Sequence, residues 1–274
     1  MNVSNYLILH ESLFRLIIFI MVLAIVAIWE VVSPRRRLKI SKPYRWVNNL
    51  GLVFLNTIIL RLTFPIAATG IGWWATQHGI GIINYWHLSG WWVIGLSIVI
   101  LDFVIYLQHV LFHKLSWLWK LHQVHHADLD YDVTTGARFH PLEIILSMLI
   151  KFAVFITLGI PVVAIIIFEI LLNATAMFNH GNIKLPYSVD KLLRLILVTP
   201  DMHRVHHSTV IKELNSNFGF NIPWWDRLCG TYRSQPQAGH KNMTIGLNYL
   251  RDEQVTQNLA KMLYMPFKSF KNHN

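Results

Sequence analysis

Three clusters of histidine have a spacing that suits metal binding. His109 and His113 lie four positions apart in HVLFH, and the strings HQVHH and HRVHH each hold three more histidines. Those six residues are His122, His125, His126, His203, His206 and His207. Residues three and four positions apart share one face of a helix, so the imidazoles of each string lie within reach of one another. Eight nitrogen ligands exceed the four that one tetrahedral zinc ion uses, which predicts two metal ions.

The ligand set narrows the choice of metal without settling it. With Cys229 as the single cysteine, this chain alone cannot build an iron–sulfur cluster or a cysteine zinc site. The sequence lacks HExxH, the usual pairing of zinc ligands with a glutamate base, which disfavours a metalloprotease. Imidazole suits iron, and two irons can share the redox work of splitting O2. We therefore expect two iron ions (Fe2+/Fe3+) with O2 as co-substrate, and zinc as a substitute; spacing does not distinguish iron from manganese or zinc.

A polar stripe supports the same interpretation. Asp102, Tyr106, His109 and His113 follow one another at i, i+4, i+7 and i+11 in an otherwise apolar segment. Polar groups at membrane depth are costly, so the stripe should face a functional interior. Metal-bound imidazoles usually donate their other N–H to a carboxylate or carbonyl. Candidate orienting carboxylates, for each of which a plain salt bridge or helix cap is the alternative, are Asp102, Asp128, Glu143, Asp201 and Asp226. The catalytic set that we predict is Asp102, Tyr106, Glu143 and Asp226.

Composition places the chain in a bilayer. Hydrophobic residues make up 54% and charged residues 14%, against about 25% charged residues in soluble domains. The net charge of +10 is concentrated beside apolar runs, as at Arg35, Arg36 and Arg37. Such cations orient membrane segments and contact anionic headgroups, and we expect no nucleic-acid partner.

Apolar runs predict an all-α, polytopic membrane protein with about four transmembrane or hairpin helices. A first helix spans 13–32, and a second apolar stretch, 50–74, contains Pro65 and should form a kinked span or a pair of tilted segments. A long helix spans 91–113, and the stretch 144–178 is divided by Gly159 and Pro161 into a hairpin.

The arginines after the first helix should stay in the cytosol, which puts the clustered histidines in a cytosolic helical cap. That membrane would be the bacterial inner membrane, or the endoplasmic reticulum in a eukaryote. We divide the chain into membrane spans (1–90), a di-metal catalytic domain with its membrane hairpin (91–235, hairpin 144–178), and an amphipathic tail (236–274). Within the tail, 255–274 should form a helix on the membrane surface.

Motif order and flanking strings resemble the fatty acid hydroxylase and sterol desaturase superfamily over about 102–232. The strings are DFVIYLQHVLFH, RFHPLE, NHGN, PDMHRVHH and NFGFNIPWWDRLCGTY. The resemblance implies a cytosol-facing di-metal centre that hydroxylates or desaturates a fatty acyl, sterol or ether-lipid substrate. The eight histidines above match the ligand motifs, and His180 of NHGN sits where the family has a further ligand. His140 of RFHPLE is included in the metal set, although a hydrogen-bond partner of a ligand or a turn residue are equal alternatives.

Oxidation of this kind consumes electrons that the chain has no motif to supply. There is no GxGxxG, no haem signature and no cysteine cluster. We therefore expect an external donor, cytochrome b5-like, a ferredoxin or a reductase. It would dock on a basic face that includes Lys114, Lys120 and Arg204. The alternative is that these cations are only solvated side chains near the lipid headgroups. Competing functions are a membrane zinc hydrolase and a metal transporter whose histidines line a path.

Overall fold

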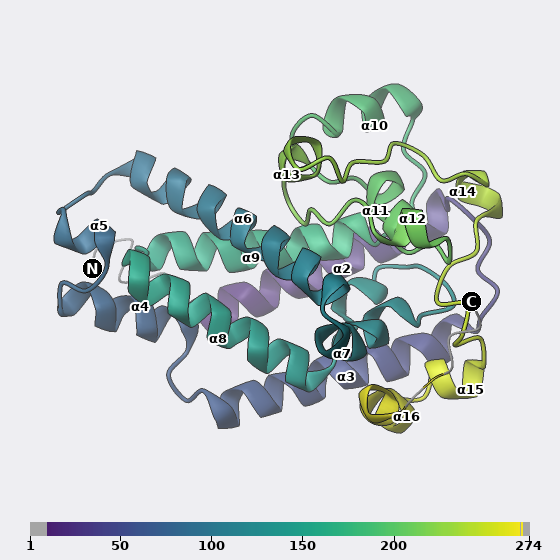
Figure 1. Cartoon of the computed structure of the whole chain (residues 1–274), viewed down its shortest axis with the longest axis horizontal. Coiled ribbons are helices and arrows are strands. Elements are labelled where there is room, and N and C mark those ends of the chain that lie inside the picture. Colours follow the sequence, from purple (N-terminus) through teal and green to yellow (C-terminus); the bar gives the residue numbers. More distant parts are fainter. Residues whose placement is uncertain (1–9, 269, 271–274) are drawn as a thin grey trace.

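The computed structural model describes residues 10–268 and 270, and in this part the backbone forms helices, short 3-10 turns and isolated β-bridges (Figure 1). Five candidate membrane spans occur among the described residues. They are α2 (Glu11–Val32), α3 (Lys42–Thr63) with its continuation to Tyr85, α6 (Trp91–Lys114), α8 (Pro141–Leu158) and α9 (Val162–Asn179). The all-α membrane fold is confirmed, and both arms of the hairpin are long enough to count as spans.

Helix α2 shows why these segments need a bilayer. An 18-residue window of this 22-residue helix has a mean hydropathy of 2.6, and only 6% of that window is buried inside the protein. Large apolar side chains such as Ile28, 65% exposed, and Val32, 77% exposed, point outward. Water would penalise such a surface, whereas acyl chains would cover it. This observation identifies an integral membrane protein.

The second apolar stretch, 50–74, forms parts of two helices, which agrees with the expected pair of segments. Helix α3 ends at Thr63, and α4 (Ala68–Gln77) follows a break that contains Pro65, before the short α5 (Ile82–Tyr85). Helix α3 begins at Lys42, earlier than the apolar run at 50 suggested. Pro43 suits a first helical turn, and Arg45 is buried against another segment, so the polar start of α3 still belongs to the helix.

The hairpin turns where glycine permits it. Helix α8 ends at Gly159, whose φ of +69° is a left-handed conformation, and α9 starts directly after Pro161. Gly81 lies against this turn so closely that a Cβ there would be 2.2 Å from the nitrogen of Gly159. The α4–α5 segment therefore packs on the closed end of the hairpin, at the left of Figure 1.

The core lies where α6, α8 and α9 meet. Leu101 and Ile105 of α6 belong to one buried cluster with Phe155 of α8 and Phe168 of α9, and all four are almost fully buried. Helix α2 packs on α9, and α3 packs on α8. The bundle thus holds α2 and α3 on its outside.

Short helices form a cap at the end opposite α4 and α5 (Figure 1). They are α7 (Ser116–His126), η1 (Thr135–Ala137), α10 (Tyr187–Leu193), α11 (Pro200–His206), α12 (Ile211–Leu214), α13 (Trp224–Leu228), α14 (Gly239–Asn242), α15 (Glu253–Thr256), α16 (Leu259–Tyr264) and η2 (Met265–Phe267). The tail is not the single surface helix that we expected: it forms α15, α16 and η2, and Met262 and Met265 are buried with Leu52 and Val124. Its residues 269 and 271–274 lie outside the described part.

Candidate metal centre

Nine histidines meet in two groups. The first group is His109, His113, His122, His126 and His206, and the second group is His125, His180, His203 and His207. Within each group one ligand atom per residue lies within 4.8 Å of all the others. The three sequence clusters and His180 therefore converge as predicted.

Each HxxHH string is divided between the two groups. In α7 the i and i+4 residues, His122 and His126, join the first group, and His125 joins the second. At α11 the i and i+4 residues, His203 and His207, join the second group, and His206 joins the first. Positions i and i+4 are nearly aligned on a helix, whereas i+3 is turned to their other side. Each string can thus serve two neighbouring ions.

Distances between ring nitrogens match ligands around an ion. In the first group, Nε2 of His109 and Nε2 of His206 are 3.0 Å apart. In the second group, Nε2 of His180 lies 3.2 Å from Nε2 of His125 and 3.1 Å from Nε2 of His207. Two nitrogens about 2.1 Å from one ion and at right angles are roughly 3.0 Å apart. Nε2 of His122 is buried without a hydrogen-bond partner, so the residues fit a metal pair.

Burial keeps the histidines of the cap in the form that binds metal. It lowers the pKa of His122 and of His180 to about 3. Burial, and then the neighbouring imidazoles, lower the pKa of the other cap histidines well below the usual value. Neutral imidazole offers a lone pair to a cation, so at neutral pH these side chains are ready ligands.

The other ring nitrogen of several ligands is held by a second partner. Nδ1 of His122 is 2.6 Å from Oε1 of Glu143, as an orienting carboxylate would be. Backbone carbonyls hold two other imidazoles in the same way. Nδ1 of His109 donates to the carbonyl oxygen of Phe218 at 2.7 Å, and Nδ1 of His206 donates to that of Ser216 at 2.8 Å. A proton held on Nδ1 leaves the Nε2 lone pair for the ion. Residue types do not indicate which carbonyls hold the histidines, because every residue has a backbone carbonyl.

Asp102, Tyr106 and Asp226 do not hydrogen-bond the clustered histidines directly. Their side-chain hydrogen bonds go to the loop 217–232 and not to clustered histidines. Asp226 accepts from the backbone N–H of Phe218 at 2.8 Å, and Tyr106 shares a hydrogen bond with Thr231 at 3.0 Å. Asp102 accepts from Asn221, Ile222 and Trp225. These residues position the loop whose Phe218 carbonyl holds His109.

His140, which the predicted metal set includes, lies at the start of a helix. It lies outside both groups and caps α8, where its Nδ1 accepts from the backbone N–H of Leu142 at 3.2 Å. Its Nε2 lies 3.1 Å from the carbonyl oxygen of Leu263. Because Pro141 begins the helix, His140 takes the capping position, and both ring nitrogens are already engaged.

Two other carboxylates and one arginine also have structural roles. Asp128 pairs with Arg45 at 2.7 Å, which joins α3 to the segment after α7. Asp201 pairs with Arg35 at 2.9 Å and with Arg204. Arg204 is fully buried, so it cannot belong to the exposed basic face that we predicted, whereas Lys114 and Lys120 are exposed.

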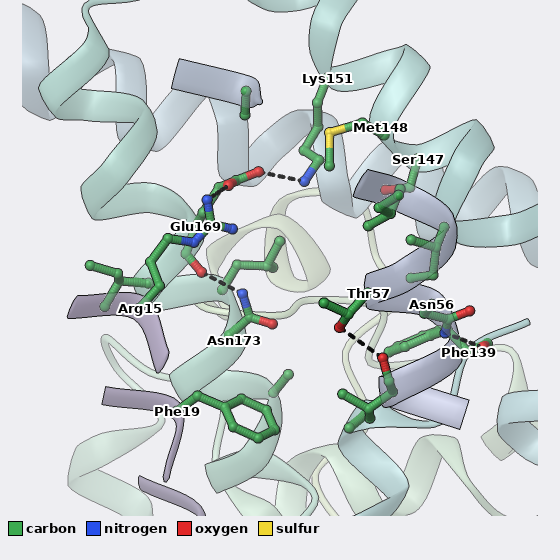
Figure 2. Close-up of a pocket in the computed structure, with 18 of the residues that line it drawn as sticks. Arg15, Phe19, Asn56, Thr57, Phe139, Ser147, Met148, Lys151, Glu169 and Asn173 are labelled. Carbon is green, nitrogen blue, oxygen red and sulfur yellow. Dashed lines mark hydrogen bonds and ion pairs between the residues drawn. The ribbon is translucent and has the colours of Figure 1, made fainter. Parts of the chain in front are cut away.

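A cavity of about 560 Å³ reaches the first group, and Figure 2 shows part of its lining. His109, His122 and Glu143 line one end of it. Its walls are largely apolar and come from the hairpin, α6, α2 and α3. The apolar lining includes Phe19, Ile105, Phe112, Phe139, Met148 and Phe152. A long apolar ligand can therefore reach the imidazoles of the first group.

Fold and site together define a helical membrane protein with a buried polyhistidine centre beside an apolar cavity. The family model for fatty acid hydroxylase matches residues 94–231, half of the chain, and the chain belongs to this family. It is accordingly an oxidoreductase.

The chain is also similar to several characterised lipid-modifying proteins. An ornithine lipid hydroxylase of Rhizobium tropici is 25% identical over 84% of this chain and 70% of its own length. An alkylglycerol monooxygenase of Homo sapiens is 27% identical over 54% of this chain and 32% of its own length. A very-long-chain aldehyde decarbonylase of Oryza sativa subsp. indica is 22% identical over 70% of this chain and 29% of its own length. No solved structure matches the chain.

Proposed function

We propose that this protein is an O2-dependent hydroxylase that oxidises a C–H bond of a membrane lipid at a pair of iron ions. The observation that carries the proposal is the apolar cavity that ends at His109 and His122 of the first group. An ornithine lipid hydroxylase and alkylglycerol monooxygenases among the relatives support a lipid substrate. Iron bound by the two groups would supply the activation of O2 that amino-acid side chains lack.

The chain's own residues would bind the metal ions, orient the imidazoles and shield the site from water. The Nε2 atoms of the nine histidines would hold the ions, and Glu143 keeps a proton on Nδ1 of His122. Apolar walls around Phe112 and Phe139 exclude water and leave a lipid C–H bond facing His109. Overall, R–H, O2, two electrons and two protons give R–OH and water.

Orientation and electron supply belong to the same proposal. Arg35, Arg36 and Arg37 directly follow α2, and the backbone N–H of Arg35 bonds Asn182, two residues after His180. The positive-inside rule then puts the histidine groups on the cytosolic side. The two electrons would come from a cytochrome b5-like protein, a ferredoxin or a reductase, docking near the exposed Lys114 and Lys120.

We retain the proposed division of the chain into domains at residues 90 and 235, although α2 and α3 also line the cavity.

The test combines metal analysis with isotope labelling. We expect purified protein to hold two irons per chain, and cells supplied with 18O2 to carry a labelled hydroxyl in one lipid class. His206→Ala should abolish the label because it removes a ligand of the first group. His78→Ala is the matched control, since His78 is exposed and outside both groups. Turnover with zinc alone, or without O2, would refute the proposal.

A further inference from the structure

The cavity holds charges that the metal centre does not need. Three cations, Arg15, Arg61 and Lys151, line it together with three carboxylates, Glu11, Glu143 and Glu169. Glu143 hydrogen-bonds His122 of the first group, whereas Arg15 and Lys151 both pair with the single carboxylate of Glu169. Charge in apolar surroundings is costly and usually marks a functional site in a membrane protein.

Arg15 and Lys151 converge on one carboxylate from two different helices (Figure 2). Nη1 of Arg15 lies 2.5 Å from Oε2 of Glu169, and Nζ of Lys151 lies 2.7 Å from Oε1. A guanidinium has five N–H donors and an ammonium has three, whereas one carboxylate offers about four acceptor sites. Donors therefore remain, and 30% of the Arg15 side chain is exposed. An anion bound there would use them.

The charged cluster and the metal groups lie at different depths of the same cavity. Glu143, which holds His122, and Lys151 are both on α8 and eight residues apart, a rise of about 12 Å. Between them the wall includes Met148 and Ile144. A ligand with one polar end and a long apolar chain fits this arrangement.

Lipid can reach the cavity from the side. Ser12 of α2 and Thr57 of α3 line it and are exposed. Helix α2 packs on α9 and α3 packs on α8, so the cavity reaches the protein surface between α2 and α3. Both helices are membrane spans, which makes the bilayer the source of the ligand.

We propose that Arg15 and Lys151 bind the anionic end of the lipid substrate, a carboxylate or a phosphate, inside the cavity. Arginine forms strong paired hydrogen bonds with both groups. The oxidised carbon then lies on the chain remote from the polar end, because Lys151 is about two turns of α8, a rise of about 12 Å, from Glu143 beside the first group. This assignment of the substrate class rests on the proposed function.

Binding measured without turnover tests the assignment. The probes are a spin-labelled long-chain carboxylate and its methyl ester, added to the protein in nanodiscs, with lysophosphatidate and inorganic phosphate as competitors. We expect the carboxylate to bind about tenfold more tightly than the ester. Arg15→Gln and Lys151→Gln should each reduce this preference, and each leaves Glu169 with a cationic partner, so both variants should fold. Arg37→Gln, an exposed arginine outside the cavity, is the matched control.

The outcomes separate this inference from the proposed function. Stronger displacement by lysophosphatidate assigns a phosphate headgroup, weaker displacement assigns a carboxylate, and inorganic phosphate should not compete. Equal binding of carboxylate and ester, or a preference that survives both glutamine variants, would show that the cluster only clamps the helices together. His206→Ala should keep the preference while losing oxidation. If the preference stands but no lipid is oxidised in the wild type, the proposed function alone fails.

Discussion

At the scale of single residues, hydrogen bonds from Nδ1 decide which nitrogen of several imidazoles is free to bind metal. Glu143 does this for His122, and backbone carbonyls do it for His109, His206 and His180. The carboxylate is buried, so its hydrogen bond to His122 is not exchanged for water. Glu143 is therefore a positioning residue of the first group.

We expect Glu143→Ala to weaken metal binding at the first group by about 10- to 100-fold. Chelator titration followed by metal analysis would show one ion released early. Glu143→Gln should recover part of the affinity, because its amide oxygen can still accept from Nδ1. Glu253→Ala, an exposed glutamate in α15, and His140→Ala should both retain two ions. Early release in His140→Ala would restore His140 to the ligand set.

At the scale of elements, the loop 215–232 holds ligands that α6 and α11 supply. Its Phe218 and Ser216 carbonyls accept from His109 and His206, both of the first group. Asp226 fixes this loop by accepting from two backbone N–H groups and from the hydroxyl of Thr231. The loop thus links the WWDRL helix α13 to the metal centre.

Replacing Asp226 by Ala should lower stability by about 2–4 kcal/mol, because buried N–H groups lose their acceptor. It should also release metal from the first group before the second, since the loop contacts ligands of the first group. Asp226→Asn, which keeps one acceptor oxygen, should fall in between. Thermal unfolding and graded chelation measure the two effects. Equal release from both groups would mean that Asp226 supports only the general fold.

At the scale of the whole molecule, the membrane bundle and the cap enclose the metal groups from opposite sides. Helices α6 and α9 bring ligands from the bundle, and α7 and α11 bring them from the cap. Metal bound by both groups would therefore join two parts of the fold, and its binding energy would add to folding stability.

Removal of metal by chelator should lower the unfolding temperature by about 5–10 °C, and added Fe(II) should restore it. Scanning calorimetry in detergent would measure the change. His206→Ala protein should respond less to chelation than wild type. An unchanged unfolding temperature in the wild type would argue against ions at both groups.

The same site predicts a direction for pH dependence in the metal-free protein. Folding lowers the pKa of His122 and His180 from 6.5 to about 3, so the unfolded chain binds more protons between these values. Stability should be complete above about pH 6.5 and fall as the pH decreases toward 3. Denaturant titrations at pH 7.5 and 5 would check this, and higher stability at pH 5 would contradict it.

The amino-acid sequence by itself determined the helical membrane class and predicted eight histidines that the fold brings together. Apolar length and imidazole spacing are local properties that survive without a structure, and His180 followed from the family resemblance. Tertiary structure alone decided how HQVHH and HRVHH divide between two groups, because this depends on how α7 and α11 face each other. It also assigned His140 to a helix cap and Asp102 and Asp226 to a supporting loop, since hydrogen-bond partners far apart in the chain meet only after packing. The charged end of the cavity has the same origin: Arg15, Lys151 and Glu169 lie on three helices that only the folded bundle brings together.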